Sequence, residues 1–396
     1  MIENLRETYN SDFTPEKYEA LLNYIERLYN FKPTFRIAET PVFFPNDFRD
    51  KLIQACDDIS ATLCQPNFKE ITEGALKAEH RVANEDAHTT FLVIDFGVCE
   101  ENGQLVPKLI ELQGFPSLYF FQHDLSMAYE KCFEIPKRMT PLFEGLDTEG
   151  YYKLLRDIIV GDSKPENVVL LEIEPEKQNT LIDFLSTHKH LGIKVLCLTK
   201  VLKRGKKLYY KNDKGKSIRI EKIYNRVIFD ELERRPDLKF GFHFSDNLDV
   251  EWIGHPNWFF RISKYIIPFL KSPYVPKTYF LNEIDTTQLD LSQFVLKPLF
   301  SFSGQGVKIH VAQSDIDAVE DRTNWILQEK VQYAPILETP SGLTKIEIRM
   351  MMVWKKDWAR PRIINNLIRL SKGEMIGVRY NKDKDWVGAS VGLFNN

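Results

Sequence analysis

The sequence has few cysteines for its length, and they form no recognisable pattern. The five are odd in number and scattered, with neither the close spacing of metal ligands nor that of a disulfide framework: Cys56, Cys64, Cys99, Cys132 and Cys197. We therefore expect reduced, buried thiols in a cytoplasmic protein. The eight histidines are scattered as well, so the sequence indicates no zinc site and no Ser–His or Cys–His catalytic pair.

Long apolar runs and biased segments are also missing. The first residues, MIENLRETYNSDF, lack the apolar core of a signal peptide, and no run reaches the ~18 apolar residues of a membrane span. A net charge of −3 creates no field that would attract nucleic acid, and neither repeats nor low-complexity segments occur. These absences predict a cytoplasmic protein whose partners include no nucleic acid and no membrane, and they leave its oligomeric state open.

The composition is otherwise that of an ordinary globular protein, with 43% hydrophobic and 28% charged residues. A chain of 396 residues is long enough for about two to three domains. We assign N-terminal helices and a β-hairpin to residues 1–160, an α/β unit to 161–248, and a mostly strand-forming unit to 249–396.

Helical periodicity dominates residues 1–80. Thr14 is placed to cap the first amphipathic helix, with Pro15 in its first turn. Asn46 or Asp47 is expected to cap a second helix of the same design. The sequence therefore predicts that this part of the chain is helical.

Strand patterns begin after residue 90. Two apolar runs flank Asn102-Gly103, a turn signal that predicts a β-hairpin, and residues ~125–160 are helical in pattern. Further on, VVLLEIE, a helix that ends at Gly192, and IKVLCL form a strand–helix–strand unit typical of parallel sheets. The lysines of 203–216 indicate either a solvated hairpin rim or an anion-binding patch.

The third unit alternates in the manner of an antiparallel sheet. We predict that its strands belong to one mostly antiparallel sheet and lie at residues 293–300, 306–312, 325–332, 346–354, 362–371 and 375–380.

A lysine near the end of one of these strands points to function. Lys297 interrupts the apolar run Phe-Val-Leu and is followed by a loop of small residues whose backbone N–H groups can close over phosphate oxygens. The loop is neither a Walker A motif nor a GxGxxG motif, and a structural hairpin is the alternative. Its candidate ligand-binding residues are Ser301, Ser303, Gly304, Gln305 and Gly306.

Other candidates surround this loop in the sequence. Lys264 precedes it, and the strand that ends at Gln328, Glu329, Lys330 and Val331 follows it. Arg349 and Arg369 lie on later strands. In this order the motifs resemble the ATP-grasp fold over residues ~255–380. The resemblance implies that Lys264 and Lys297 contact the phosphates of ATP, that the loop covers them, and that the backbone at 328–331 binds adenine.

Magnesium-binding acids do not follow these motifs, but candidates lie upstream. Asp95, Glu111 and Gln113 are similar in order to the pattern R-F-D…E-x-N of glutathionylspermidine synthetase and other circularly permuted ATP-grasp ligases. Two departures are Val93 in place of the arginine and Gln113 in place of the asparagine. Arg81 is either a substitute for that arginine or a surface residue.

The resemblance extends to the middle of the chain and implies a complete activity. Residues 161–248 look like the Rossmann-like companion domain, in which Asn225 and Arg226 either face the site or are structural. We expect an α/β (α+β) fold and an ATP- and Mg²⁺-dependent ligase. It would join the carboxylate of a small molecule or peptide to an amine, or to a thiol, through an acyl phosphate. An ATP-grasp kinase and a degenerate nucleotide-binding protein without turnover, motivated by Val93 and Gln113, are the alternatives.

Overall fold

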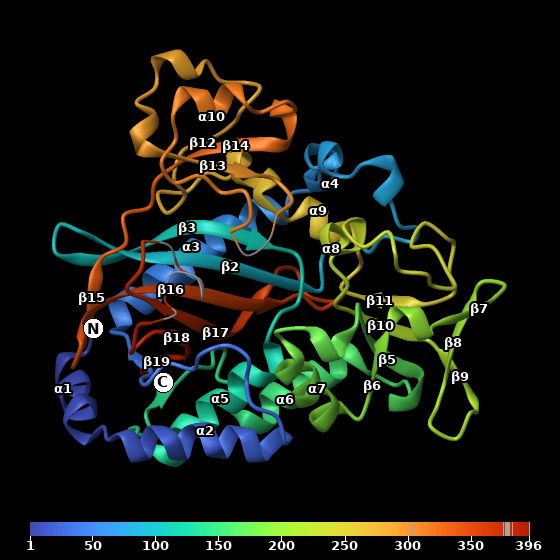
Figure 1. Ribbon diagram of the computed structural model, residues 1–396, viewed down its shortest axis with the longest axis horizontal. Helices are drawn as coiled ribbons and strands as arrows, with labels where there is room; N and C mark the ends of the chain where they lie inside the picture. The colour runs from blue at the N-terminus through green and yellow to red at the C-terminus, as the bar shows by residue number, and fades with distance from the viewer. Residues whose placement is uncertain (302–303, 375, 377–380, 382, 396) are drawn as a thin grey trace.

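The computed structural model describes residues 1–301, 304–374, 376, 381 and 383–395 (Figure 1). Its helices and sheets confirm the mixed α/β class. The largest element is a six-stranded antiparallel sheet of order β18-β17-β16-β2-β3, in which β15 also pairs with β16. Its strands are β2 Phe91–Glu101, β3 Gln104–Gln113, β15 Pro335–Thr339, β16 Gly342–Val353, β17 Arg362–Ser371 and β18 Gly388–Ser390. Two distant parts of the sequence therefore share one sheet.

The predicted hairpin, which forms one edge of this sheet, is confirmed. Asn102 and Gly103 both have positive φ angles, 52° and 75°, as a tight turn between β2 and β3 requires. Leu92, Ile94 and Phe96 pack with residues of α3 on one face of the sheet. The opposite face is covered by α5 and α6 only in part, and Figure 1 shows these helices below the sheet. These three helices span Asn46–Leu63, Tyr119–Cys132 and Thr148–Ile159.

The N-terminal region is less helical than its periodicity predicts. Thr14 caps α2 (Pro15–Tyr29) as expected, by accepting a hydrogen bond from the Lys17 N–H group. Helix α3 begins after Pro45, and the predicted cap by Asn46 or Asp47 is wrong because neither side chain accepts such a bond. The segment between these helices contains β1 (Val42–Phe43), which pairs with β19 (Gly392–Asn395). Remaining elements of this region are α1 Glu3–Asp12, α4 Phe68–Ile71 and β4 Met139–Thr140.

The middle of the chain forms a parallel four-stranded sheet of order β11-β10-β5-β6, as the strand–helix–strand pattern predicts. The helix α7 ends at Gly192, whose φ of 71° is the left-handed conformation that glycine favours. These elements are β5 Val168–Glu172, α7 Leu181–Leu191, β6 Lys194–Cys197, β10 Lys222–Asn225 and β11 Glu251–Ile253. Strand β11 lies beyond residue 248, so this sheet extends into the third assigned unit.

The lysine-rich segment is a separate three-stranded sheet that projects from the body on the right of Figure 1. It consists of β7 Leu202–Arg204, β8 Lys207–Lys211 and β9 Ser217–Ile220. Its six lysines between residues 203 and 216 are exposed, as a solvated rim requires.

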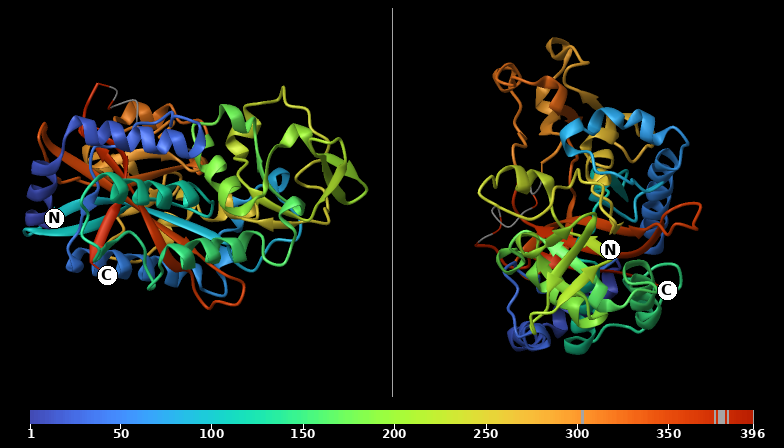
Figure 2. Two further views of the ribbon diagram at one scale, coloured as in Figure 1. Left: turned by 90° about the horizontal axis from the view of Figure 1, so that it is seen from below. Right: turned by 90° about the vertical axis from the view of Figure 1, so that its right-hand side faces the viewer.

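The single sheet predicted for the third unit is wrong, because its strands divide between two sheets. Strands β12, β13 and β14 form a small antiparallel sheet that Figure 1 and the right-hand view of Figure 2 show above the large one, while β16 and β17 belong to the large sheet. Residues 306–312 make one bridge, Leu296 to Lys308, and are not a strand. Residues 375–380 lie almost wholly outside the described residues. The small unit contains β12 Thr278–Phe280, β13 Phe294–Pro298, β14 Trp325–Glu329 and α10 Gln313–Asp317.

Two short helical segments connect the sheets. They are α9 (Asn257–Arg261) and the 3-10 segment Lys264–Phe269, here η6; α8 (Phe229–Glu233) precedes them. All five cysteines are free thiols. In the described part of the chain no helix has the length and apolarity needed to cross a membrane.

Candidate functional site

Charged side chains gather on one face of the large sheet, where the small sheet meets it. In the strand register Asp95 stands opposite Glu111 on β3 and opposite Arg349 on β16. Glu347 stands opposite Arg369 on β17 in the neighbouring row. Residues two apart on a strand point to the same face, so the register alone directs these side chains to one side of the sheet. We call them, together with Lys264 and Lys297, the charged cluster.

Asp95 is the most fully paired member of the charged cluster. It is 1% exposed, and its Oδ1 and Oδ2 atoms accept hydrogen bonds from Nε and Nη2 of Arg349, each at 2.6 Å. Nη2 of Arg369 donates to Oδ2 at 2.8 Å. Burial alone would raise the pKa of Asp95, but the two guanidinium charges hold it below its ordinary value. Asp95 is therefore an anion in the folded protein.

Glu347, a member of the charged cluster, and Tyr333, which contacts it, were not among the predicted site residues. Glu347 lies 2.7 Å from Nη1 of Arg369 and accepts a hydrogen bond of 2.8 Å from the Tyr333 hydroxyl, while burial raises its pKa. The spacing Glu347-x-Arg349 on a strand was the signal that could have identified it. A Cβ atom at Gly97 would lie 2.9 Å from the side chains of Tyr333 and Val331, so glycine allows their close approach.

The two lysines of the charged cluster lie outside the large sheet, Lys297 on β13 and Lys264 on η6. Lys297 is 8% exposed, and its Nζ atom donates to Oε1 of Gln328 at 2.5 Å and to the Ile110 carbonyl at 3.0 Å. Burial, together with the nearby Lys264 charge, lowers the pKa of Lys297 to about 8, although Glu111 opposes the shift. The ammonium group thus bridges β13, β14 and the end of β3, at the boundary between the two sheets.

Lys264 lies at the first position of η6 and completes this side of the site. Its Nζ atom donates to the Ser301 carbonyl at 2.7 Å and lies 3.8 Å from Oε2 of Glu111. Glu111 also accepts a hydrogen bond of 3.1 Å from Nε2 of Gln113. The structure therefore brings the upstream acids and the downstream lysines together, although about 190 residues separate Glu111 from Lys297.

Among the described residues of the small-residue loop, the first one contacts the charged cluster. Ser301 contributes its carbonyl to Lys264, and Ser303 lies outside the described residues. Gly304 and Gly306 have φ angles of 69° and 73°, a left-handed conformation that glycine tolerates without strain. The Gln305 side chain accepts a hydrogen bond from Arg234, so this part of the loop faces the end of α8.

The side chains of the predicted adenine-binding segment lie in two different surroundings. Gln328 contacts Lys297 through its side chain, while its Nε2 atom is buried without a partner. Val331 lies against Gly97. The side chains of Glu329 and Lys330 accept from the Lys277 N–H group and donate to the Ser292 carbonyl, respectively, within the small unit. The backbone N–H groups of these two residues donate to the carbonyls of Lys277 and Gln293, at 2.9 and 2.8 Å, and the adenine contact at 328–331 stays a prediction.

The described side chains do not fit a magnesium ion at Asp95. Mg²⁺ prefers near-octahedral oxygen coordination, and both carboxylate oxygens of Asp95 already accept hydrogen bonds from guanidinium groups. Among the described residues there is no group of three or more His, Cys, Asp or Glu side chains arranged to hold a metal ion. The magnesium site of Asp95, Glu111 and Gln113 stays a prediction.

Four weaker candidates lie in other surroundings. The Arg81 side chain is 45% exposed and pairs with Glu73, as a surface arginine would. Arg226 and Asn225 are buried at the carboxyl end of β10, and the Arg226 guanidinium lies 5.0 Å from the centre of the Phe115 ring. Val93 packs among apolar side chains, on the face of the large sheet that α5 and α6 cover.

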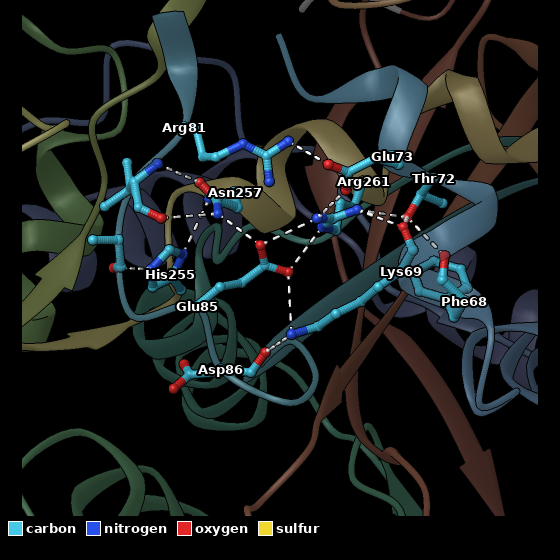
Figure 3. A network of polar contacts seen from close by, with 12 residues as sticks. Phe68, Lys69, Thr72, Glu73, Arg81, Glu85, Asp86, His255, Asn257 and Arg261 are labelled. Carbon is cyan, nitrogen blue, oxygen red and sulfur yellow. Dashed lines mark hydrogen bonds and ion pairs between the residues drawn. The ribbon is translucent and has the colours of Figure 1, made fainter. Parts of the chain in front are cut away.

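A network of polar contacts holds the helix that precedes Lys264 (Figure 3). Arg261 is 2% exposed and donates to Glu85 Oε1 at 2.8 Å, to Glu73 Oε2 at 2.9 Å and to the Lys69 carbonyl at 2.8 Å. Asn257 donates to the second oxygen of Glu85 at 2.7 Å. The network therefore ties α9 to the segment 69–85 and fixes the start of η6.

The fold is similar to a solved structure over almost its whole length. A glutathione synthetase-like effector from Globodera pallida, solved in its apo form, superimposes with a TM-score of 0.56 and 10% sequence identity, covering 97% of this chain and 98% of that one. No family profile matches the sequence, and no curated protein matches it. At this identity the likeness concerns the fold alone. The chain thus shares the overall fold of this effector, and the ATP-grasp assignment with its permuted order of motifs stays a prediction.

Proposed function

We propose that the protein is an ATP-dependent ligase that joins a carboxylate to an amine, or to a thiol, through an acyl phosphate. The observation that supports this most is the meeting of Lys264 and Lys297 with Arg349 and Arg369 at one boundary between two sheets. Four cations from four separate elements are suited to a polyphosphate, because charge-assisted hydrogen bonds to phosphate oxygens are among the strongest in proteins. The glutathione synthetase-like fold agrees with this class of reaction.

Each group has a role in this proposal. Lys264 and Lys297 hold the phosphates, and the backbone at 328–331 receives the adenine. A carboxylate oxygen of the substrate attacks the γ-phosphorus, ADP leaves, and the amine then displaces inorganic phosphate from the acyl carbon. Arg349 and Arg369 stabilise the charge that develops on the transferring group. The substrate would be a small-molecule or peptide carboxylate in the cytoplasm.

Nucleotide binding without turnover is the second candidate. It is favoured by Asp95, whose ion pairs with Arg349 and Arg369 occupy the carboxylate that a metal-dependent ligase would use. A kinase would transfer the same phosphoryl group to a hydroxyl and form a stable ester.

Hydroxylamine distinguishes these reactions. Added to the protein with ATP and a panel of carboxylic acids, it should trap the acyl phosphate as a hydroxamate, with one ADP released for each product. The same panel is run with the Lys297→Met variant, and the ADP that this variant releases is subtracted as background hydrolysis. A phosphoester without hydroxamate would indicate a kinase. If the protein binds nucleotide but releases no more ADP than the Lys297→Met variant, the ligase proposal is wrong and nucleotide binding without turnover takes its place.

Nucleotide affinity should fall as the pH rises above about 8. Lys297 loses its proton near this pH, and a bound phosphate would raise its pKa, so binding takes up a proton in that range. The weakening should approach about tenfold per pH unit above the midpoint. Titration of a non-hydrolysable ATP analogue between pH 7 and 10 measures it. The Lys277→Met variant, at a side chain 75% exposed, should keep the same midpoint, and a flat profile would contradict the role of Lys297.

A further inference from the structure

The acids of the charged cluster already have cationic partners inside the protein. Asp95 pairs with Arg349 and Arg369, Glu347 pairs with Arg369, and Glu111 lies 3.8 Å from Lys264. Adjacent carboxylates repel each other and need a cation between or beside them. In this chain, arginine and lysine supply that charge, so the repulsion between Asp95 and Glu111 does not require a metal ion.

The balance of charge in the cluster is positive. Three carboxylates face four cations, which leaves a formal charge of +1 in a largely buried place. Protonation of Glu347, whose pKa burial raises, would make this charge more positive. A divalent cation brought to Asp95 would meet two guanidinium groups within hydrogen-bond distance of the same oxygens. An anion meets the opposite field, and a low local dielectric strengthens that attraction.

The geometry at Asp95 also fits a role in holding side chains. Arg349 donates through Nε and Nη2 to the two carboxylate oxygens, a bidentate arrangement that fixes the plane of its guanidinium group. Arg369 contacts Asp95 through Nη2 and Glu347 through Nη1, so two acids fix its orientation. Its side chain is still 32% exposed, which leaves part of the guanidinium group open to a ligand.

We propose that Asp95 is a positioning residue for Arg349 and Arg369, and that the charged cluster binds the phosphates of its nucleotide directly, without a divalent cation. This inference rests on the proposed function for the identity of the ligand, but its chemistry applies to any polyphosphate. Arginines that are already held in place lose less conformational entropy when they bind an anion.

The wild-type protein provides the first test. A non-hydrolysable ATP analogue is titrated in EDTA and again in excess Mg²⁺, and the two dissociation constants should agree within about threefold. Binding in EDTA that is weaker by roughly 100-fold or more would overturn the inference and leave the proposed function standing.

The Asp95→Asn variant tests the positioning role, because it keeps the shape of the side chain and removes its charge. We expect the analogue to bind about tenfold more weakly in EDTA and in Mg²⁺ alike, since the arginines are no longer held. A loss confined to the Mg²⁺ buffer would identify Asp95 as a metal ligand and overturn the inference. An affinity in EDTA equal to that of the wild type would overturn the positioning role.

Two further measurements keep the test decisive. If Asp95→Asn does not fold, Arg369→Met changes a more exposed side chain and should weaken binding in EDTA by about tenfold. Tripolyphosphate in EDTA separates the two proposals. Its binding without any binding of the ATP analogue would contradict the proposed function and support the anion site, whereas failure of both ligands to bind in EDTA would overturn the inference.

Discussion

Replacing Lys264 and Lys297 together by methionine should abolish nucleotide binding in a protein that still folds. Each ammonium group is expected to contribute a charge-assisted hydrogen bond to phosphate, worth about 1.5–3 kcal/mol, so the double variant should bind roughly a hundredfold more weakly or worse. Methionine keeps most of the length of the apolar stem. The fold should survive because the substitution also removes two buried charges whose desolvation opposes folding, as the lowered pKa values of both lysines indicate.

Some stability will still be lost. Gln328 and the Ile110 carbonyl lose the donor that Lys297 provides, and the Ser301 carbonyl loses Lys264, each at a cost of about 1–3 kcal/mol before the gain from charge removal. Calorimetric titration measures binding, and circular dichroism confirms the fold. Lys277→Met is the matched control, because this lysine lies on the small unit outside the charged cluster. If the single variants unfold more easily but keep their affinity for ATP, both lysines are structural.

Arg261→Met should cost about 3–5 kcal/mol of unfolding free energy, the largest effect on stability that we expect. Its guanidinium group satisfies Glu85, Glu73 and two further acceptors, while the side chain itself is almost completely buried. Without it, Asn257 and Lys69 are the partners that the described residues still offer to the partly buried Glu85 carboxylate. Urea unfolding followed by tryptophan fluorescence measures the difference, since Trp258 lies in the helix that Arg261 anchors.

Arg81→Met provides an unusually close control. Arg81 binds the other oxygen of the same Glu73 carboxylate, as Figure 3 shows, but its side chain is 45% exposed. Exposed ion pairs contribute about 0–1 kcal/mol, so this variant should unfold almost as the wild type does. Equal losses for Arg261→Met and Arg81→Met would mean that the network does not anchor α9. On the proposed function, an Arg261→Met protein that still folds should also bind nucleotide less tightly, because α9 leads directly into Lys264.

Local sequence signals predicted the elements that depend on neighbours in the chain. The hairpin at Asn102-Gly103 follows from turn chemistry, and the cap at Thr14 follows from the needs of a helix N-terminus. The parallel strand–helix–strand unit ending at Gly192 follows from apolar strands and a glycine stop. The strand predicted at 306–312 was wrong, because this segment makes a single bridge.

Local sequence patterns could not predict which strands belong to the same sheet. Alternation shows that β14 and β16 are strands, but it does not state their partners, and they enter different sheets. Pairing is decided by which apolar faces can be buried together: Ile326 of β14 packs into the core between the two sheets, and Ile348 of β16 packs into the same core from the other side. The register between β2 and β16, which lie far apart in the sequence, is therefore set only when the chain folds.

What the sequence determined by itself was the set of chemical groups and their order: Lys264, Lys297, Arg349 and the upstream acids on apolar strands. The tertiary structure alone decided their partners. The sequence places Asp95 in an apolar strand, where an acid needs a cation, and magnesium was the natural prediction. Strand register instead sets Arg349 directly opposite Asp95, and the neighbouring strand brings Arg369. Charge compensation depends on distances of a few ångströms, and only folding brings residues 254 positions apart within that range.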